Sequence, residues 1–458
     1  MRKISSFGYL LAFVLPVLVI FSMRLGDSYL LMPAAFVFIG FPILDYLIGT
    51  DTSNISSAFE AKYLNNIYYK LLLYTWALVQ TMVFFYSCYY INTHSLSGIA
   101  WIGMALNGMI ISGGIGITVA HELGHKKNKF DRIMSKILLM QVFYGHFYIE
   151  HNRGHHVNVS TPTDPSSAKK GQTFYAFLIQ SIFGGIKSAW ELEKQRLIIK
   201  KQAIFSWHNE ALRLWFFSLL LFTSIVFISS NSLGYFHYDL LIYLLAQSLL
   251  AIIVLEGANY IEHYGIQRKL LADGKYEKVN PTHSWNTNHI ISNFLLFQLQ
   301  RHSDHHKTAS KPYQLLSQYE DSPQLPNGYP AMFLLALIPT LWFKVMHPKL
   351  KNWEELCNDG ENYGNEGENL SPKEKILFEN IKDKKVLKIQ DAYLFSKSGK
   401  IEENHGRDLA EMIAHFPFVK TISSIIITHN QLGPEGLQIL VDSPILPKVN
   451  YLHLGSND

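Results

Sequence analysis

Nine histidines stand in four short clusters whose spacing could hold metal ions. The first cluster reads His121-Glu-Leu-Gly-His125 and follows directly on a long apolar stretch. Side chains four residues apart share one face of a helix, so both imidazoles can reach one centre. Two further clusters add an adjacent pair of histidines, and a lone histidine follows another apolar stretch. The nine are His121, His125, His151, His155, His156, His263, His302, His305 and His306.

The number of imidazoles indicates how many metal ions the clusters could hold. Zinc takes four ligands, so nine exceed the needs of one first-row ion, and two ions with four or five ligands each fit better. Neutral imidazole suits Zn, Cu, Fe and Ni, which leaves the metal open, whereas an all-nitrogen shell argues against Mg and Ca. The first cluster also matches the H-E-x-x-H motif of zinc proteases, but that match is weak on its own.

Metal-bound imidazoles usually donate their second ring N–H to a partner. Acidic residues near the clusters are candidates for this role, with the alternative that they are simply solvated at a membrane edge. Asp164 and Glu262 are the preferred pair. The full set is Glu122, Glu150, Asp164, Glu262 and Asp304.

The composition indicates what must position these residues. Of the 458 residues, 48% are hydrophobic and only 17% are charged, against roughly 25% charged in soluble domains. This excludes a disordered or collagen-like chain and favours a membrane protein. The two cysteines, Cys88 and Cys357, exclude a disulfide scaffold and any internal centre that needs four thiolates.

Six apolar segments are long enough to cross a bilayer. The first could instead be a cleaved signal peptide, but no convincing small-x-small cleavage site follows it, which favours an uncleaved helix. Three shorter apolar stretches are expected to lie at the membrane surface or to be re-entrant: 136–149, 176–189 and 331–345. The predicted spans are Phe7–Met23, Ser28–Gly49, Ile67–Ile91, Ser95–Ala120, Asn209–Ser230 and Tyr238–Ile261.

The distribution of charge orients the spans. The segment 121–208 holds 13 Lys and Arg, while the short loops near 92–93 and 230–237 hold none. By the positive-inside rule the long segment and both termini are cytoplasmic, which puts all four histidine clusters at the cytoplasmic edge. Five basic residues beside the clusters could dock an acidic electron carrier or simply follow this rule. They are Lys126, Lys127, Arg153, Arg301 and Lys307.

The C-terminal part has a different character. Residues 1–350 carry a net charge of +9 and residues 351–458 a net charge of −5. An acidic linker is expected over 351–370 and a tail over 371–458. Within the tail, 422–430 and 449–457 share the L-x-x-L-x-L-x-x-N pattern of leucine-rich repeats at an offset of 27 residues, with a helix expected near 436–441 and another near 407–415. The tail could be truncated or end irregularly, and could bind a protein partner or only aid solubility.

Several strings resemble one family, the integral-membrane alkane 1-monooxygenases. The resemblance covers about residues 1–350, and wider relatives are the membrane fatty acyl desaturases. It implies an all-α membrane protein with six transmembrane helices and a cytoplasmic, histidine-rich diiron cap, to which a small α/β repeat-like tail is attached. The strings that carry it are His121-Glu-Leu-Gly-His125-Lys, Glu150-His-Asn-Arg-Gly-His-His156, Thr161-Pro-Thr-Asp-Pro-Ser-Ser-Ala168, Asn259-Tyr-Ile-Glu-His-Tyr-Gly265 and Leu299-Gln-Arg-His-Ser-Asp-His-His306.

The resemblance also implies chemistry. The nine histidines would hold two non-haem iron ions, and the enzyme would oxidise the terminal methyl of a medium- or long-chain alkane to a primary alcohol with O2. Electrons would come from rubredoxin as a separate chain, reduced by an NAD(P)H-dependent reductase, in a bacterial inner membrane and without nucleic acid. The alternatives are a desaturase or hydroxylase acting on an acyl chain or another hydrocarbon, and a non-catalytic metal carrier.

The fourth span contains four glycines that bear on the substrate route. Small residues in a membrane helix permit either close helix packing or a slot for an alkyl chain. A slot that ends at the first histidine pair would present a chain end-on and would explain attack at the terminal carbon. The glycines are Gly108, Gly113, Gly114 and Gly116.

Overall fold

The computed structural model describes residues 6–319, 321–366, 386–390, 424–428, 433–442 and 451–453. Contacts divide the chain into two units, Met1–Leu350 and Lys351–Asp458. The first unit is a helical bundle, and the second contains a small parallel sheet. Each unit is described by itself below.

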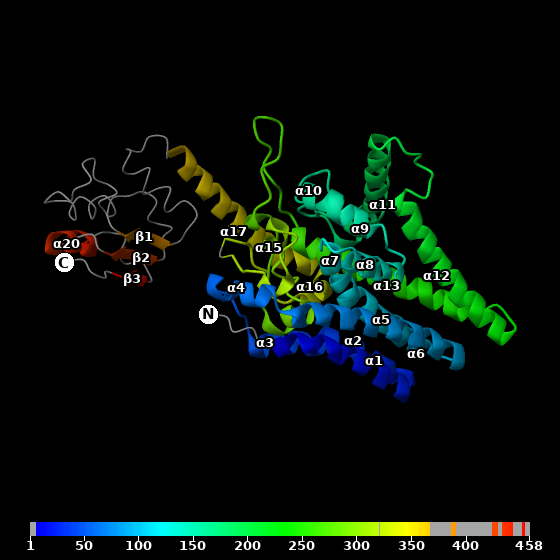
Figure 1. The fold of residues 1–458 in the computed structure, drawn as a ribbon. Helices are drawn as coiled ribbons and strands as arrows, with labels where there is room; N and C mark the ends of the chain where they lie inside the picture. The colour runs from blue at the N-terminus through cyan, green and yellow to red at the C-terminus, as the bar shows by residue number, and fades with distance from the viewer. Residues whose placement is uncertain are drawn as a thin grey trace. The chain divides into compact units, whose positions relative to one another are not determined.

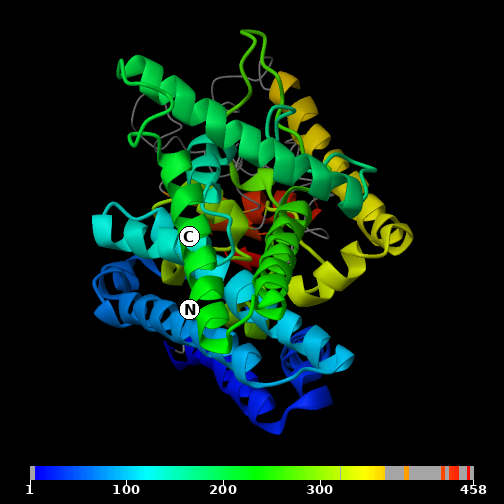
Figure 2. The same cartoon turned by 90° about the vertical axis from the view of Figure 1, so that its right-hand side faces the viewer.

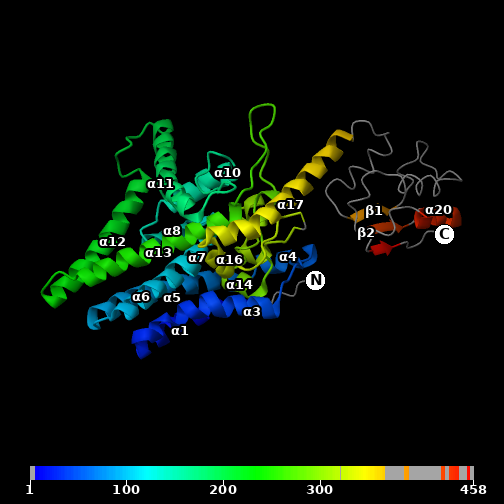
Figure 3. The ribbon, with the colours of Figure 1, turned by 180° about the vertical axis from the view of Figure 1, so that it is seen from behind.

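Among its described residues, the first unit contains six helices long and apolar enough to span a membrane, which confirms the predicted number. In Figures 1 and 3 the long helices of these spans run alongside one another. The spans are Ser6–Leu25, Asp27–Ile48, Ala58–Thr93, Gly98–Gly124, Glu210–Leu233 and Tyr238–His263.

Several spans are composite. The first joins a 3-10 turn to an α-helix, and the second and fourth contain π-helical segments. The elements in chain order are η1 (Ser6–Phe13), α1 (Val14–Leu25), η2 (Asp27–Leu31), α2 (Met32–Ala35), η3 (Phe36–Gly40), α3 (Phe41–Ile48), α4 (Ser57–Leu64), α5 (Ile67–Thr93), α6 (Gly98–Gly108), η4 (Met109–Gly116), α7 (Ile117–Gly124), α12 (Glu210–Leu233) and α13 (Tyr238–His263).

Local sequence explains where the long helices begin and end. Asn66, Ser97 and Asn209 cap α5, α6 and α12, because each side chain accepts a hydrogen bond from a free amide of the first turn. Gly234 ends α12 with a φ of 76°, a left-handed conformation that glycine adopts without strain. The turn to α13 can therefore be short.

The fourth span is the centre of the bundle. In its most apolar window 83% of the residues are buried, against 28–50% in the other spans. Its glycines explain this, because a Cβ at Gly113 would lie 2.6 Å from the Cα of Ala251, and one at Gly108 would lie 2.7 Å from the Cβ of Gln247. These positions let α13 approach closely.

The remaining elements gather at the end of the bundle where α7 and α13 finish. In Figures 1 and 2 the helix α11 runs crosswise to α12. These elements are α8 (Lys129–Met140), α9 (Phe147–Glu150), η5 (His151–His155), α10 (His156–Asn158), α11 (Phe174–Ile199), η6 (Pro281–His283), α14 (Ile290–Leu295), α15 (His302–Lys307), η7 (Tyr313–Leu315), α16 (Tyr329–Ala336) and α17 (Pro339–Glu366).

The three shorter apolar stretches are not continuous helices with the predicted limits. The stretch 136–149 is divided between α8 and α9, and 176–189 lies inside the longer α11. The stretch 331–345 is divided where Pro339 starts α17, a position that suits proline because the first turn has no amide partner. The helix α17 continues to Glu366, through most of the segment expected to be a linker.

The second unit contains β1 (Val386–Gln390), β2 (Ser424–Thr428), α20 (Gly433–Asp442) and β3 (Tyr451–His453). The three strands within the described part of this unit are parallel in the order β1-β2-β3, and Ser424 pairs with Tyr451, an offset equal to that of the sequence repeat. The leucine-rich-repeat interpretation remains a prediction. The helix expected near 407–415 lies outside the described residues.

Candidate metal centre

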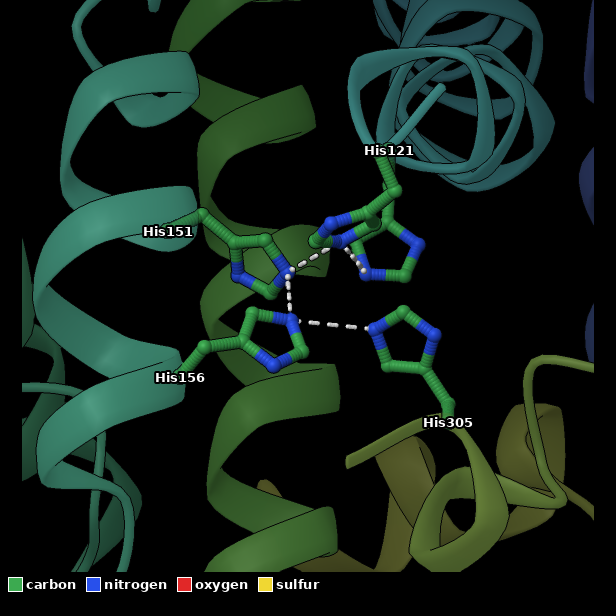
Figure 4. A group of neighbouring side chains, drawn as sticks. His121, His151, His156 and His305 are labelled. Carbon is green, nitrogen blue, oxygen red and sulfur yellow. Dashed lines mark hydrogen bonds between the residues drawn. The ribbon is translucent and has the colours of Figure 1, made fainter. Parts of the chain in front are cut away.

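The structure brings all nine histidines together in two adjacent groups. Within each group the possible ligand atoms lie within 4.8 Å of one another. Figure 4 shows four members of the larger group with their rings directed toward a common centre. The five-histidine group is His121, His125, His151, His156 and His305, and the four-histidine group is His155, His263, His302 and His306.

The distances between ring nitrogens fit metal binding. Neighbouring Nε2 atoms are 3.1–3.3 Å apart in the five-histidine group and 2.9–3.2 Å apart in the four-histidine group. Ligand nitrogens about 2.1 Å from one ion are about 3.0–3.4 Å apart. A neutral imidazole has a single N–H, so a ring of converging nitrogens is poorly satisfied by hydrogen bonds alone. The residues therefore fit two first-row ions.

A π-helical turn decides how the second cluster is divided. In an α-helix, residues five apart point about 140° away from each other. In η5 the His156 amide donates to the His151 carbonyl, the wider i→i+5 pattern. The Nε2 atoms of His151 and His156 are consequently 3.1 Å apart, while His155 turns to the other group. The sequence interpretation, based on four-residue spacing, did not anticipate this division.

Ordinary helical geometry divides the third cluster. His302 and His306 lie four residues apart on α15, and their Nε2 atoms are 2.9 Å apart. His305 points instead toward His156, at 3.1 Å. A single turn of α15 thus supplies both groups, as η5 does.

Burial keeps the imidazoles neutral. Loss of solvation lowers the pKa well below 6.5 for His125, His151, His156, His302, His305 and His306, and neighbouring histidines lower it further. Metal binding requires the neutral form, since a protonated nitrogen has no free lone pair. Burial therefore leaves the ring nitrogens unprotonated and able to bind a metal cation.

The two preferred acids both reach the four-histidine group, in different ways. Asp164 Oδ2 lies 3.0 Å from His155 Nδ1, the rear nitrogen, and also accepts a hydrogen bond from Ser167 Oγ at 2.6 Å. Glu262 Oε2 instead lies 3.3 Å from His302 Nε2, the nitrogen that faces the group. Asp164 therefore contacts the His155 nitrogen that points away from the group, whereas Glu262 contacts the His302 nitrogen that points into it.

Glu122, Asp304 and Arg153 form ion pairs with other side chains. Glu122 pairs with Lys126 at 2.5 Å, and Asp304 pairs with Lys311 at 2.7 Å. Arg153 bonds to Glu193 and Glu210. Arg301 is only 1% exposed, so it cannot form part of a docking surface. The side chains of His283 and His289 bond to Glu277 and Thr287.

An apolar pocket leads from the spans to the histidines. Its wall combines residues of η3, η4, α13, α14 and α16, and it ends at His121, His151 and His302. Gly114 lines it, and a Cβ there would meet nothing within 4 Å, unlike one at Gly113. Gly113 therefore permits close packing of two helices, and Gly114 leaves open space in the pocket. Sequence reasoning did not find the aromatic wall residues Phe38, Phe147 and Phe333, because they come from distant segments.

A buried histidine centre at the end of six spans defines a class of membrane metalloenzyme. A family model described as fatty acid desaturase matches residues 95–336, just over half of the chain. The chain therefore belongs to this broad family, and the matched range contains all nine histidines.

Comparison with individual relatives identifies the branch of this family to which the chain belongs. Alkane 1-monooxygenase of Pseudomonas putida is 41% identical over 312 residues, 68% of this chain and 76% of the relative. Alkane 1-monooxygenase 2 of Alcanivorax borkumensis is 38% identical over 378 residues, 80% of this chain and 97% of the relative. The hydroxylase component XylM of the xylene/toluene monooxygenase of Pseudomonas putida is 30% identical over 54% of this chain and 63% of the relative. The chain belongs to the alkane 1-monooxygenase family.

Proposed function

We propose that the protein hydroxylates the terminal carbon of medium- or long-chain alkanes, using O2 and electrons from rubredoxin. The observation that carries this proposal is the apolar pocket that ends at His121, His151 and His302. In the overall reaction an alkane, O2, two electrons and two protons give a primary alcohol and water. The histidine end of the bundle would face the cytoplasm of a bacterial inner membrane, where a reductase can supply rubredoxin with electrons.

The nine histidines would hold two iron ions, one in each group. Iron bound there would supply the O2 activation and C–H oxidation that no side chain can perform. The chain itself would position the substrate and exclude water. Seven of the nine histidines are buried, and Thr118 and Phe147 line the pocket beside them.

The pocket favours a hydrocarbon over an acyl substrate. Along its described wall there is no lysine or arginine, and the polar side chains gather at the histidine end, where Asn259, Glu262 and Tyr329 lie. A thioester or phospholipid headgroup would need polar contacts at the opposite end of the chain. An alkane needs none, and an apolar wall with a single reactive end would present its terminal methyl to the metals.

The first experiment tests the reaction itself. Protein in lipid, loaded with iron and supplied with rubredoxin, its reductase and NADH, should convert n-octane or n-hexadecane to primary alcohol. The variant His302→Ala should lose this activity, while His208→Ala should keep it because His208 is exposed and belongs to neither group. An alkene formed from a long acyl thioester, with alkanes unchanged, would contradict the proposal.

The neighbouring glycines give a matched test of the substrate pocket. Gly114→Leu should place a side chain in open space and shift the preferred alkane to shorter chains, with normal thermal stability. Gly113→Ala should instead force α13 away, because its Cβ would lie 2.6 Å from the Cα of Ala251. We expect a loss of roughly 1–3 kcal/mol of stability from this overpacking. An unchanged chain-length profile in Gly114→Leu would mean that substrate lies elsewhere.

A further inference from the structure

The apolar pocket has one end at the histidines and another at the outer surface of the bundle. The residues at the histidine end, such as His302 and Glu262, are 2% exposed. At the other end Val37, Phe38 and Phe333 are only half-buried. Val254 of α13 lies eight residues before Glu262, which corresponds to about 12 Å along the helix. The pocket thus extends away from the metals along α13.

The half-buried end of the pocket adjoins exposed apolar side chains. Ile39 follows Phe38 and is 60% exposed, and Leu334 follows Phe333 and is 38% exposed. Apolar side chains with such exposure on a spanning bundle are those that contact acyl chains. The opening is therefore lateral, between η3, α13 and α16, and a substrate dissolved in the bilayer could reach it without crossing water.

Two aromatic rings meet at this opening. Phe38 comes from η3 and Phe333 from α16, and their rings stack with centroids 5.9 Å apart and planes 30° from parallel. Behind Phe333 stands Gly257 of α13, where a Cβ would lie 2.5 Å from the ring. Phe174 meets the same ring edge-on at 6.0 Å. Phe333 is thus fixed from behind, and its free side faces Phe38 and the pocket.

We propose that Phe38 and Phe333 form a lateral aromatic gate that selects substrates by cross-section. The proposal rests on the function proposed above and adds a specificity element to it. An unbranched chain is one methylene wide and can pass between two rings that part slightly. A methyl-branched or cyclic hydrocarbon is wider and requires a larger displacement of Phe333, which Gly257 and Phe174 oppose. The depth of the pocket would set chain length, and the gate would set width.

The matched test compares substrates of different width in one assay. Each protein receives n-octane and methylcyclohexane in competition, and the ratio of the two kcat/KM values is measured. Phe333→Leu, and more strongly the double variant Phe38→Leu/Phe333→Leu, should raise the ratio for the cyclic substrate about tenfold. Phe38→Trp should lower it. Leu334→Ala, one residue away but lipid-facing, should leave the ratio unchanged.

The possible outcomes distinguish failure of the gate proposal from failure of the proposed function. The value of kcat for n-octane should stay within about twofold of the wild type in Leu334→Ala, because Leu334 is not among the residues that line the pocket. If n-octane is hydroxylated normally while the ratio stays at the wild-type value in the double variant, the gate is wrong and the proposed function stands. If the wild type oxidises neither hydrocarbon, the proposed function fails, and with it the gate.

Discussion

The two histidine groups offer the same kind of ligand atom in different surroundings. The five-histidine group has two partly exposed members, His125 and His156, whereas every member of the four-histidine group is buried. Among the described residues, the carboxylate contacts of these imidazoles, from Asp164 and Glu262, belong to the four-histidine group. Ligand number alone therefore does not describe the centre. The smaller group has one imidazole fewer, but it is fully buried and has a carboxylate side chain against two of its rings.

The largest expected effect comes from removing one ligand from each group. His263→Ala and His125→Ala should each lower alkane hydroxylation more than about 100-fold, because both ions are needed for turnover. Bound iron should fall from about two ions per chain to about one, and the ion that remains should differ between the variants. Elemental analysis and Mössbauer spectra of iron-57 samples measure this. Identical spectra from both variants would show that the groups are not distinct.

A smaller effect is expected when the rear carboxylate loses its charge. Asp164→Asn should weaken iron binding at one site by about 10–100-fold and leave the other site unchanged. Ser167→Ala removes a hydroxyl that donates to Asp164 and accepts from the Ser160 amide, and it should weaken the same site by a few-fold at most. Equal weakening of both sites would contradict the assignment of Asp164 to the four-histidine group. Metal titration in the presence of a competing chelator measures the two affinities.

The two histidine groups should also differ in the rate at which a chelator removes their iron. Because His125 and His156 are partly exposed, a hydrophilic chelator should remove iron from the five-histidine group first. We expect a two-phase time course in the wild type, with rates several-fold apart. In Asp164→Asn the slower phase should move toward the faster one. A single phase in the wild type would argue that both ions leave through one common opening of the structure.

The smallest expected effect concerns Glu193 of α11. Its carboxylate bonds to Arg153 of η5 at 2.5 Å, and η5 carries histidines of both groups. Burial opposes ionisation of Glu193, but hydrogen bonds from two arginines and from the Glu210 amide lower its pKa to about 2. Since this pKa is below the ordinary value of about 4.3, Glu193 stabilises the fold above pH 4.3 and loses this effect as the pH falls toward 2.

The variant Glu193→Gln should therefore be less stable than the wild type at neutral pH, by about 1–3 kcal/mol. The difference should shrink between pH 4.3 and pH 2. Thermal unfolding in detergent across this range measures it, with Glu191→Gln as a more exposed control on the same helix. Both iron sites should respond alike, because η5 serves both groups.

Much of this architecture was predictable from the sequence. Six spans and the four histidine clusters follow from apolar length and residue spacing, and both depend on local properties of the chain. The division of the histidines was not predictable, because it depends on a π turn at His151–His155 that spacing alone does not indicate. The sequence also could not distinguish Gly113 from Gly114, since both line the pocket but only Gly113 packs against α13.

The pocket and its aromatic gate were beyond sequence reasoning for a related reason. Phe38 and Phe333 are nearly 300 residues apart, and their contact depends on how α16 folds back onto α13. The leucine-rich-repeat interpretation of the tail, and the positions assigned to the linker, remain predictions.

The direction of two helices has an electrostatic consequence. The fourth span ends at Gly124 and the sixth at His263, so both present their carbonyl ends to the histidines. A helix carries about half a negative charge at its C-terminus, and two such ends together amount to roughly one. This field attracts cations and favours the more highly charged form of a bound ion. The helix backbones would therefore lower the reduction potential of the centre, before any side chain is considered.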